Sequence, residues 1–307
     1  MRIEDASAAM APGVTHQRAS TVGAAAGRGH AAPPILISLS AFGAAEVRRH
    51  GQLWCAELSL AAGVDGVEVR SELLMEPARE LPAIAQVVQA AGKSLVYSSA
   101  EYLWTEGGTL DVSALERALT AAQTLGAARL KMAIGGFGTA SHCTLDDLQE
   151  RLQSAHVELL IENDQTPAAG TLAALQDFFA TANAQGLFLG MTFDMGNWHW
   201  TGECSLQAAV ALAPQVRYVH CKGVQRQPQR WVAVPLAESS APWRAVLRAL
   251  PADVPWAIEY PLVGDELLTV VRLEIDHLRG VAASLAGTAP DASTHSCQIT
   301  SKKPQHE

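Results

Sequence analysis

Four β-prone runs of the sequence each end on a side chain that can bind a metal ion or move a proton. Three carboxylates and one imidazole form a hard, oxygen-rich ligand set, which suits Mn²⁺ or Mg²⁺ best and also accepts Co²⁺ or Zn²⁺. Carboxylates in such a set can also serve as general acids and bases. The pattern therefore predicts that all four meet around one divalent metal ion. The four side chains are Glu162, Asp194, His220 and Glu259, at the ends of the runs 157–162, 189–194, 216–220 and 256–259.

These runs belong to a regular alternation of strands and helices that starts near residue 35. Strict alternation with short connections is typical of parallel strands, and eight units in about 250 residues indicate a (β/α)8 TIM barrel rather than an open doubly wound sheet of five or six strands. Glycines such as Gly63, Gly92, Gly126 and Gly186 just before a strand support the helix ends. The expected strands are 35–40, 66–70, 94–98, 128–134, 157–162, 189–194, 216–220 and 256–259, and the expected helices are 44–62, 77–91, 111–125, 144–152, 170–185, 205–213, 240–250 and 264–285.

A TIM barrel brings the carboxyl ends of its strands together at one face, where active sites lie. If the eight units are counted correctly, the four metal-competent residues end the last four strands and are neighbours around half of the barrel mouth. Each of them also has an ordinary structural interpretation. A carboxylate at a strand end can cap the next helix or pair with a lysine, and a single histidine is often structural. Four in consecutive strands favour the metal site.

The composition excludes several classes of function. The 307 residues carry a formal net charge of −9, which repels phosphate backbones and anionic lipids and predicts neither a nucleic-acid nor a membrane partner. No run approaches the roughly 18 apolar residues of a membrane-spanning helix. The five cysteines are scattered without a Cys-x-x-Cys pair, which predicts reduced thiols and a cytoplasmic location. We expect a disordered leader over 1–33, a single catalytic barrel over 34–286 and a flexible tail over 287–307.

The four strand ends resemble the ligand strands of the xylose isomerase-like TIM barrel superfamily, which includes sugar isomerases, ketose 3-epimerases and dehydratases. The resemblance covers about 35–285. The runs 162–166 and 40–43 are most similar to the epimerase-like proteins of 2-ketogluconate utilisation. The motifs are Ile161-Glu162-Asn163, Phe193-Asp194-Met195-Gly196-Asn197, Val219-His220-Cys221-Lys222 and Ile258-Glu259-Tyr260.

The resemblance implies a division of roles among the ligands. The residues that match Glu162 and Glu259 both bind the metal and move the proton, whereas those that match Asp194 and His220 are ligands only. It implies an isomerase or epimerase of a keto sugar, sugar acid or sugar phosphate, acting through a metal-stabilised cis-enediolate. A lyase of the inosose or dehydroshikimate dehydratase type is the alternative, followed by a non-catalytic sugar-binding barrel. The partner is a small sugar or sugar acid, and superfamily members often form homo-oligomers.

Five further residues are predicted to contact the substrate, and two departures from the epimerase pattern bear on its identity. Asn197 stands where many relatives carry a histidine, and Ala168 stands where they tend to carry a carboxylate. For several of the five, a plain salt bridge or a solvated position remains open, including a buried ion pair between Glu68 and Arg70. The predicted substrate-binding residues are Asn197, Lys222, Arg226, Glu68 and His199.

Overall fold

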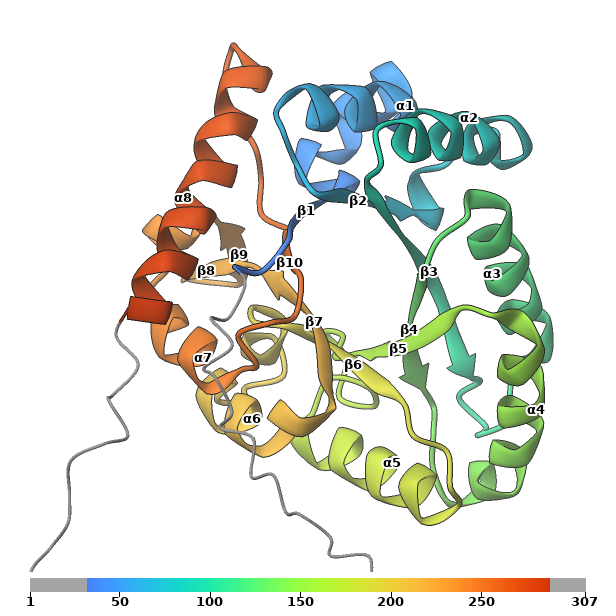
Figure 1. The fold of residues 1–307 in the computed structure, drawn as a ribbon. Coiled ribbons are helices and arrows are strands. Elements are labelled where there is room, and N and C mark those ends of the chain that lie inside the picture. Colours follow the sequence, from blue (N-terminus) through green and yellow to red (C-terminus); the bar gives the residue numbers. More distant parts are fainter. Residues whose placement is uncertain (1–31, 288–307) are drawn as a thin grey trace, which may run out of the picture. The chain divides into compact units, whose positions relative to one another are not determined.

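The computed structural model describes residues 32–287, which form a closed barrel of eight parallel strands surrounded by helices (Figure 1). Around the barrel the strands follow the order β1, β2, β3, β4, β5, β6, β7, β10, and β10 pairs with β1 to close it. The predicted TIM barrel is confirmed. The barrel strands are β1 (Ile35–Ser38), β2 (Gly66–Arg70), β3 (Ser94–Trp104), β4 (Arg129–Gly135), β5 (Glu158–Glu162), β6 (Gly190–Asp194), β7 (Val216–Cys221) and β10 (Trp256–Ile258).

The helices cover the outside of the barrel, each between two consecutive barrel strands or after the last one. None of those within residues 32–287 is both long and apolar enough to cross a membrane. Most of the predicted leader and most of the predicted tail lie outside the described residues. The helices are α1 (Ala44–Ala61), α2 (Pro77–Ala90), α3 (Val112–Leu125), α4 (Leu145–Ala155), α5 (Leu172–Ala184), α6 (Ser205–Leu212), α7 (Trp243–Ala249) and α8 (Leu267–Gly287).

Period-two alternation along the strands separates the inside of the barrel from the helix-facing side. A small cluster of fully buried side chains fills the interior, and a much larger one lies between the strands and the helices. Two residues further along each strand, the same face carries polar groups, among them Glu162 after Leu160 and His220 after Tyr218. The apolar interior cluster therefore lies one layer below the polar residues of the mouth. It consists of Leu36, Val96, Leu160, Tyr218 and Ala257.

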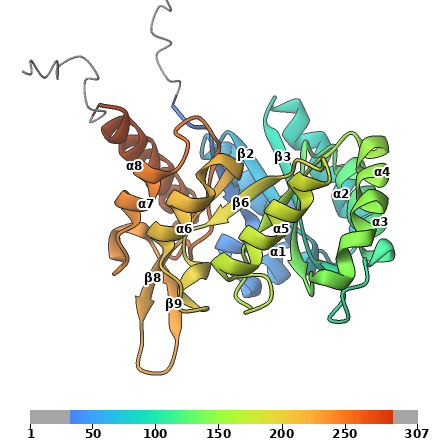
Figure 2. The same cartoon turned by 90° about the horizontal axis from the view of Figure 1, so that it is seen from below.

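Two features of the mouth differ from the prediction. The strand predicted over 94–98 continues to Trp104, with an irregularity in its pairing to β4 between Ser98 and Tyr102. The segment after β7, expected as a loop, is an antiparallel hairpin of β8 (Gly223–Arg226) and β9 (Trp231–Val234) that projects from the barrel (Figure 2). Each of its strands has four residues, which is too short for an alternating pattern to stand out in the sequence.

Candidate metal centre

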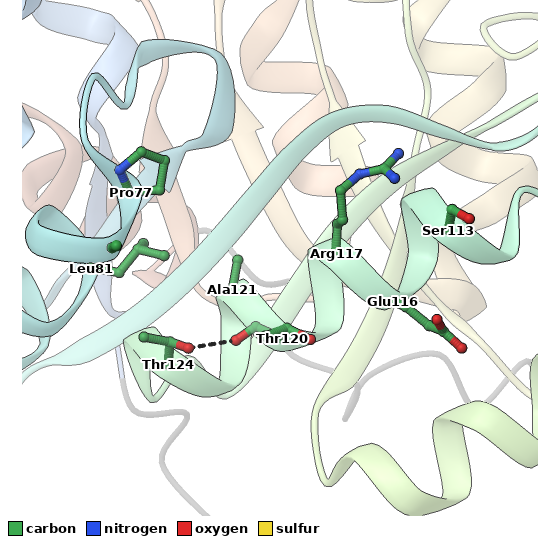
Figure 3. A pocket seen from close by; sticks show the side chains of 9 residues that line it. Pro77, Leu81, Ser113, Glu116, Arg117, Thr120, Ala121 and Thr124 are labelled. Atoms are coloured by element: carbon green, nitrogen blue, oxygen red, sulfur yellow. Dashed lines mark hydrogen bonds between the residues drawn. The ribbon is translucent and has the colours of Figure 1, made fainter.

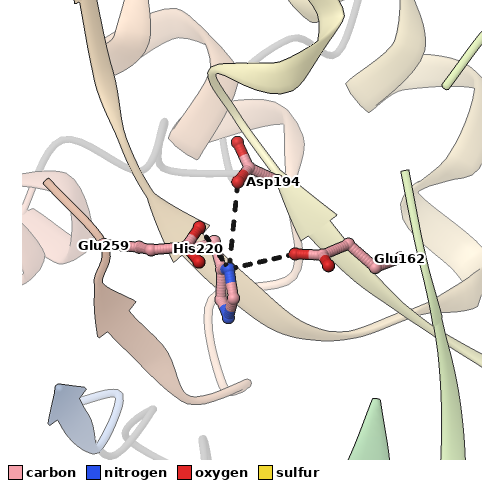
Figure 4. Close-up of side chains that lie close together, drawn as sticks. All are labelled: Glu162, Asp194, His220 and Glu259. Carbon is pink, nitrogen blue, oxygen red and sulfur yellow. Dashed lines mark hydrogen bonds and ion pairs between the residues drawn. The ribbon is translucent and has the colours of Figure 1, made fainter. Parts of the chain in front are cut away.

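The four predicted ligands meet at the mouth of the barrel (Figure 4). Glu162 and Asp194 are the last residues of β5 and β6, His220 lies near the end of β7, and Glu259 directly follows β10. One ligand atom from each lies within 4.8 Å of the others. Asp194 and His220 are direct partners in the register of β6 and β7, so the parallel pairing places their side chains at the same height. Sequence spacing and barrel closure together bring the four into one cluster.

The imidazole of His220 is oriented by a carboxylate on each side. Its Nδ1 lies 2.8 Å from Glu259 Oε2, 3.2 Å from Glu162 Oε1 and 3.8 Å from Asp194 Oδ2. Its Nε2 lies 2.7 Å from Oε2 of Glu68, which is fully buried on β2. When Nε2–H donates to Glu68, the lone pair of Nδ1 faces the three other carboxylates, which is the arrangement of a metal-binding histidine held by an outer carboxylate. The donor set therefore fits a divalent ion.

Asp194 is held by a turn that uses one of its two oxygens. Its Oδ1 accepts hydrogen bonds from the backbone N–H groups of Gly196 and Asn197, at 2.8 and 2.9 Å, and Oδ2 faces the centre. The side chain of Asn163 bonds both the N–H and the carbonyl of Asp194, each at 2.9 Å, and so joins the ends of β5 and β6. A short polar side chain that accepts from the N–H groups two and three residues on is typical of such turns.

Three cations surround the carboxylates. Lys131 of β4, with 1% of its side chain exposed, donates to Glu162 Oε1 at 2.9 Å. Arg70 at the end of β2 donates to Glu259 Oε1 at 2.5 Å. Lys222 contacts Asp194 Oδ2 at 2.6 Å and Glu259 Oε2 at 2.8 Å. A dense set of opposite charges in a buried place is the pattern expected of a functional site, although structural ion-pair networks share it.

These contacts decide the protonation of the centre. Burial alone would raise the pKa of Glu259, but His220 and Lys222 lower it well below its ordinary value. Burial would also raise the pKa of Glu162, but Lys131 and His220 outweigh this effect and lower it below its ordinary value. For His220, burial lowers the pKa, whereas Glu259 and Glu68 raise it well above the ordinary value. Glu162 and Glu259 therefore stay ionised, and an ion that binds His220 Nδ1 must replace a proton there.

Two of the predicted substrate residues lie inside this cluster with their polar atoms already paired. Glu68 contacts Ser38, Lys131 and Arg70 in addition to His220 and is fully buried. Lys222 is bound to two of the ligand carboxylates. The buried ion pair between Glu68 and Arg70 is present at 3.4 Å. A direct substrate contact by either residue stays a prediction.

The other three predicted substrate residues lie around or above the cluster. Asn197 is buried, donates to Asn163 O at 2.9 Å and accepts from Gln165 Nε2 at 3.1 Å. His199, in the short helix that follows β6, packs against Trp231 of the hairpin with the two rings tilted and their centroids 4.8 Å apart. Arg226 is exposed on β8, with its guanidinium 5.3 Å from the centre of the same ring. Trp231 thus links two of the predicted residues, and sequence spacing alone did not single it out.

Asp164 is an acidic residue of the mouth to which no role was assigned from the sequence. It lies two residues beyond Glu162, and its Oδ1 accepts from the backbone N–H and hydroxyl of Thr166 at 2.7 and 2.8 Å. Its Oδ2 is buried, and the hydroxyl of Tyr102 lies beside this carboxyl. Burial raises the pKa of this carboxyl, and the charge of Glu162 adds to the increase. The sequence could have indicated Asp164, because it lies two residues after the predicted ligand Glu162.

Two surface grooves lie between helices on the outside of the barrel. One of about 530 Å³ runs between α2 and α3 (Figure 3). Its charged residues are already paired, Arg117 with Glu101 and Glu116 with Arg151. The other, of about 330 Å³, lies between α7 and α8. Neither groove contains any of the four metal-competent residues, so the chemistry of the mouth, and not the size of a groove, locates the candidate site.

Comparisons with known proteins agree with this fold. No protein-family model and no curated protein matches the sequence. The probable 3-DHS dehydratase AsbF from Bacillus anthracis, involved in petrobactin synthesis, aligns with a TM-score of 0.61 and 13% identity over 80% of this chain and 98% of its own. An L-ribulose 3-epimerase aligns with a TM-score of 0.61 and 14% identity, over 86% and 100% of the two chains.

A D-allulose 3-epimerase from Methylomonas, solved in complex with D-allulose, aligns with a TM-score of 0.55 and 14% identity, over 83% of this chain and 96% of that one. The protein is therefore a TIM barrel of the type found in sugar epimerases and a dehydratase. Identities this low show the fold alone. These structures confirm the TIM-barrel fold that the resemblance implies.

Proposed function

We propose that the protein is a divalent-metal-dependent isomerase or epimerase of a keto sugar, sugar acid or sugar phosphate. The observation that carries the proposal is that two carboxylates of the candidate metal centre, Glu162 and Glu259, lie on opposite sides of it. Figure 4 shows Glu259 and Glu162 on opposite sides of the His220 ring. Removing a proton next to a carbonyl and returning it to the other face requires a base and an acid on opposite sides of the substrate.

The proposed roles follow from the contacts of each residue. Glu162 and Glu259 bind the ion and exchange the proton, while Asp194 and His220 are ligands only. Lys131 and Arg70 each hold one oxygen of a carboxylate proposed to transfer the proton, and so fix the orientation of that carboxylate. A divalent ion held by the four side chains would supply positive charge opposite the negative charge that develops on the substrate oxygens. Mn²⁺ or Mg²⁺ suits this oxygen-rich set best.

The charges of the centre favour a sugar acid among the proposed substrates. Four carboxylates lie with three cations and an imidazole in one buried cluster. A divalent ion added to this cluster leaves it with a net positive charge while the imidazole is neutral. Such a centre attracts an anionic ligand more strongly than a neutral sugar. Arg226, His199 and Asn197 are proposed to contact the rest of the substrate, and homo-oligomers and a cytoplasmic location stay predictions.

A lyase that dehydrates a hydroxy acid is the second candidate. It is supported by the name of the Bacillus anthracis structure, a probable dehydratase, and by the presence of Asn197 where many epimerases carry a histidine. Both reactions begin with removal of a proton next to a carbonyl and differ in whether water then leaves. The site residues proposed for the first step are the same.

Proton exchange in D₂O distinguishes the candidates. With Mn²⁺ and a panel of keto sugars and sugar acids, we expect deuterium to enter the substrate without loss of water for an epimerase, and net dehydration for a lyase. Because general acid–base catalysis contributes about 10²–10⁴-fold, Glu162→Gln and Glu259→Gln should slow exchange by that factor at saturating Mn²⁺. Glu158→Gln, at the exposed start of the same strand as Glu162, is the matched control. Full exchange in both site variants would rule out the proposed roles.

A further inference from the structure

Lys222 makes contacts that none of the roles above requires. It follows β7 directly and lies two residues after His220, on the same side of the strand. Its side chain is 11% exposed, and Nζ lies 2.6 Å from Asp194 Oδ2 and 2.8 Å from Glu259 Oε2. One ammonium group therefore bridges two of the four metal-competent residues.

The two oxygens that Lys222 contacts are the ones through which those residues can reach an ion. Asp194 Oδ1 already accepts two backbone N–H groups, which leaves Oδ2. Glu259 Oε1 is held by Arg70, which leaves Oε2, and that oxygen lies 2.8 Å from His220 Nδ1 as well. A carboxylate oxygen has two lone pairs, so an ion can reach Oε2 only after one of these two donors leaves. An ammonium group that stays beside the same oxygens also repels the ion.

We infer that Lys222 competes with the divalent ion for Asp194 and Glu259 and is displaced when the ion binds. This inference rests on the metal centre of the proposed function. A second acceptor for the displaced ammonium is at hand, because Asn197 Oδ1 lies 3.2 Å from Nζ. Lys222 thereby lowers the affinity of the centre for metal and stabilises the two carboxylates in the metal-free protein.

Gly196 provides the room in which the lysine stem lies. A Cβ atom at this position would lie 2.8 Å from both Cγ and Cδ of Lys222, closer than non-bonded carbon atoms approach. The backbone of Gly196 has φ −86° and ψ −40°, a conformation that alanine adopts without strain. Gly196→Ala should therefore push the lysine away from the carboxylates while every charge of the centre is kept.

The test is a calorimetric titration of the full-length apoprotein with Mn²⁺. We expect Lys222→Met to bind Mn²⁺ about tenfold tighter or more, which corresponds to about 1.4 kcal/mol. Gly196→Ala should also bind more tightly, whereas Lys222→Arg, which keeps the charge, should stay near the wild-type affinity. Thermal melting in chelator reports whether each variant is folded, and the increase in melting temperature on adding Mn²⁺ gives a second measure of affinity.

Lys131→Met separates competition from a general effect of charge. Lys131 is more deeply buried than Lys222 but contacts one oxygen of the four metal-competent residues instead of two, so its removal should raise the affinity for Mn²⁺ less. The inference is overturned if Lys222→Met binds Mn²⁺ no more tightly than the wild type. It is equally overturned if Lys131→Met matches Lys222→Met and Gly196→Ala has no effect. Absence of Mn²⁺ binding in every variant overturns both this inference and the proposed metal centre, whereas wild-type binding that Asp194→Asn abolishes supports the centre by itself.

Discussion

Replacing Glu68 by glutamine tests whether this residue orients a metal ligand or contacts the substrate. Glu68 Oε2 lies 2.7 Å from His220 Nε2, and neither side chain is exposed to solvent. Its other oxygen lies 3.1 Å from Ser38 Oγ and 3.3 Å from Lys131 Nζ, both of them donors. A glutamine can place its oxygen toward only one of these two sides, and its NH₂ group then faces a donor on the other.

The expected loss follows from the buried contact. A hydrogen bond to a charged group contributes about 1.5–3 kcal/mol, and its loss in a buried place weakens the orientation of His220 Nδ1 by a comparable amount. Since each 1.4 kcal/mol is a factor of ten, Mn²⁺ should bind about 10–100-fold more weakly to Glu68→Gln, in the range seen for outer partners of metal-binding histidines. At saturating Mn²⁺ the KM for substrate should change little.

Calorimetry with Mn²⁺ and steady-state kinetics at saturating Mn²⁺ measure the two quantities separately. Glu72→Gln is the matched control, because Glu72 also pairs with Arg70, at 3.0 Å, but lies at the surface and does not touch His220. An unchanged affinity for Mn²⁺ together with a raised KM would refute the positioning role. That result would support the substrate contact predicted from the sequence.

Two further substitutions probe the framework that holds the centre. Asp65→Asn should lower the free energy of unfolding by about 1 kcal/mol at pH 7, because it removes the negative charge that strengthens the hydrogen bond from Ile35 N–H, at 3.0 Å, and that pairs with Arg279 at 3.2 Å. Burial raises the pKa of Asp65, but that bond and Arg279 lower it below its ordinary value, so the stabilisation is present above the unfolded pKa and is lost as pH falls through the folded one. Urea denaturation at pH 7 and pH 3 should show the difference shrinking in acid, and a constant difference would contradict this. Asn163→Ala removes two buried hydrogen bonds to the backbone of Asp194 and should lower the free energy of unfolding by about 2–4 kcal/mol. Urea denaturation in the presence of chelator measures this loss. A loss below about 0.5 kcal/mol would show that other contacts hold the ends of β5 and β6.

Much of the barrel could be predicted because its signals are local. A short apolar run predicts a strand that is buried on both sides, and the residue at its carboxyl end is predicted to lie at the mouth of the barrel. Neither prediction requires knowledge of distant parts of the chain. Glu162 and Asp194 end their strands as predicted, and Glu259 lies one residue beyond the end of β10. The hairpin after β7 was missed because its strands have only four residues each. β9 is a short apolar run, but β8 shows neither such a run nor an alternation of apolar and polar residues.

The sequence by itself determined the four metal-competent side chains and the strands that carry them, and hence the chemistry that a metal ion held by them could support. Only the tertiary structure decided which charges surround those side chains. Glu68 lies 152 residues from His220 along the chain, and Arg70 lies 189 residues from Glu259, yet each pair is in hydrogen-bond contact. Alternation along a strand tells which side chains enter the barrel, but closure of the barrel and the register between strands decide which of them face one another across it. The competition that we infer for Lys222 also depends on barrel closure and strand register, because these decide where the oxygens of Asp194 and Glu259 point.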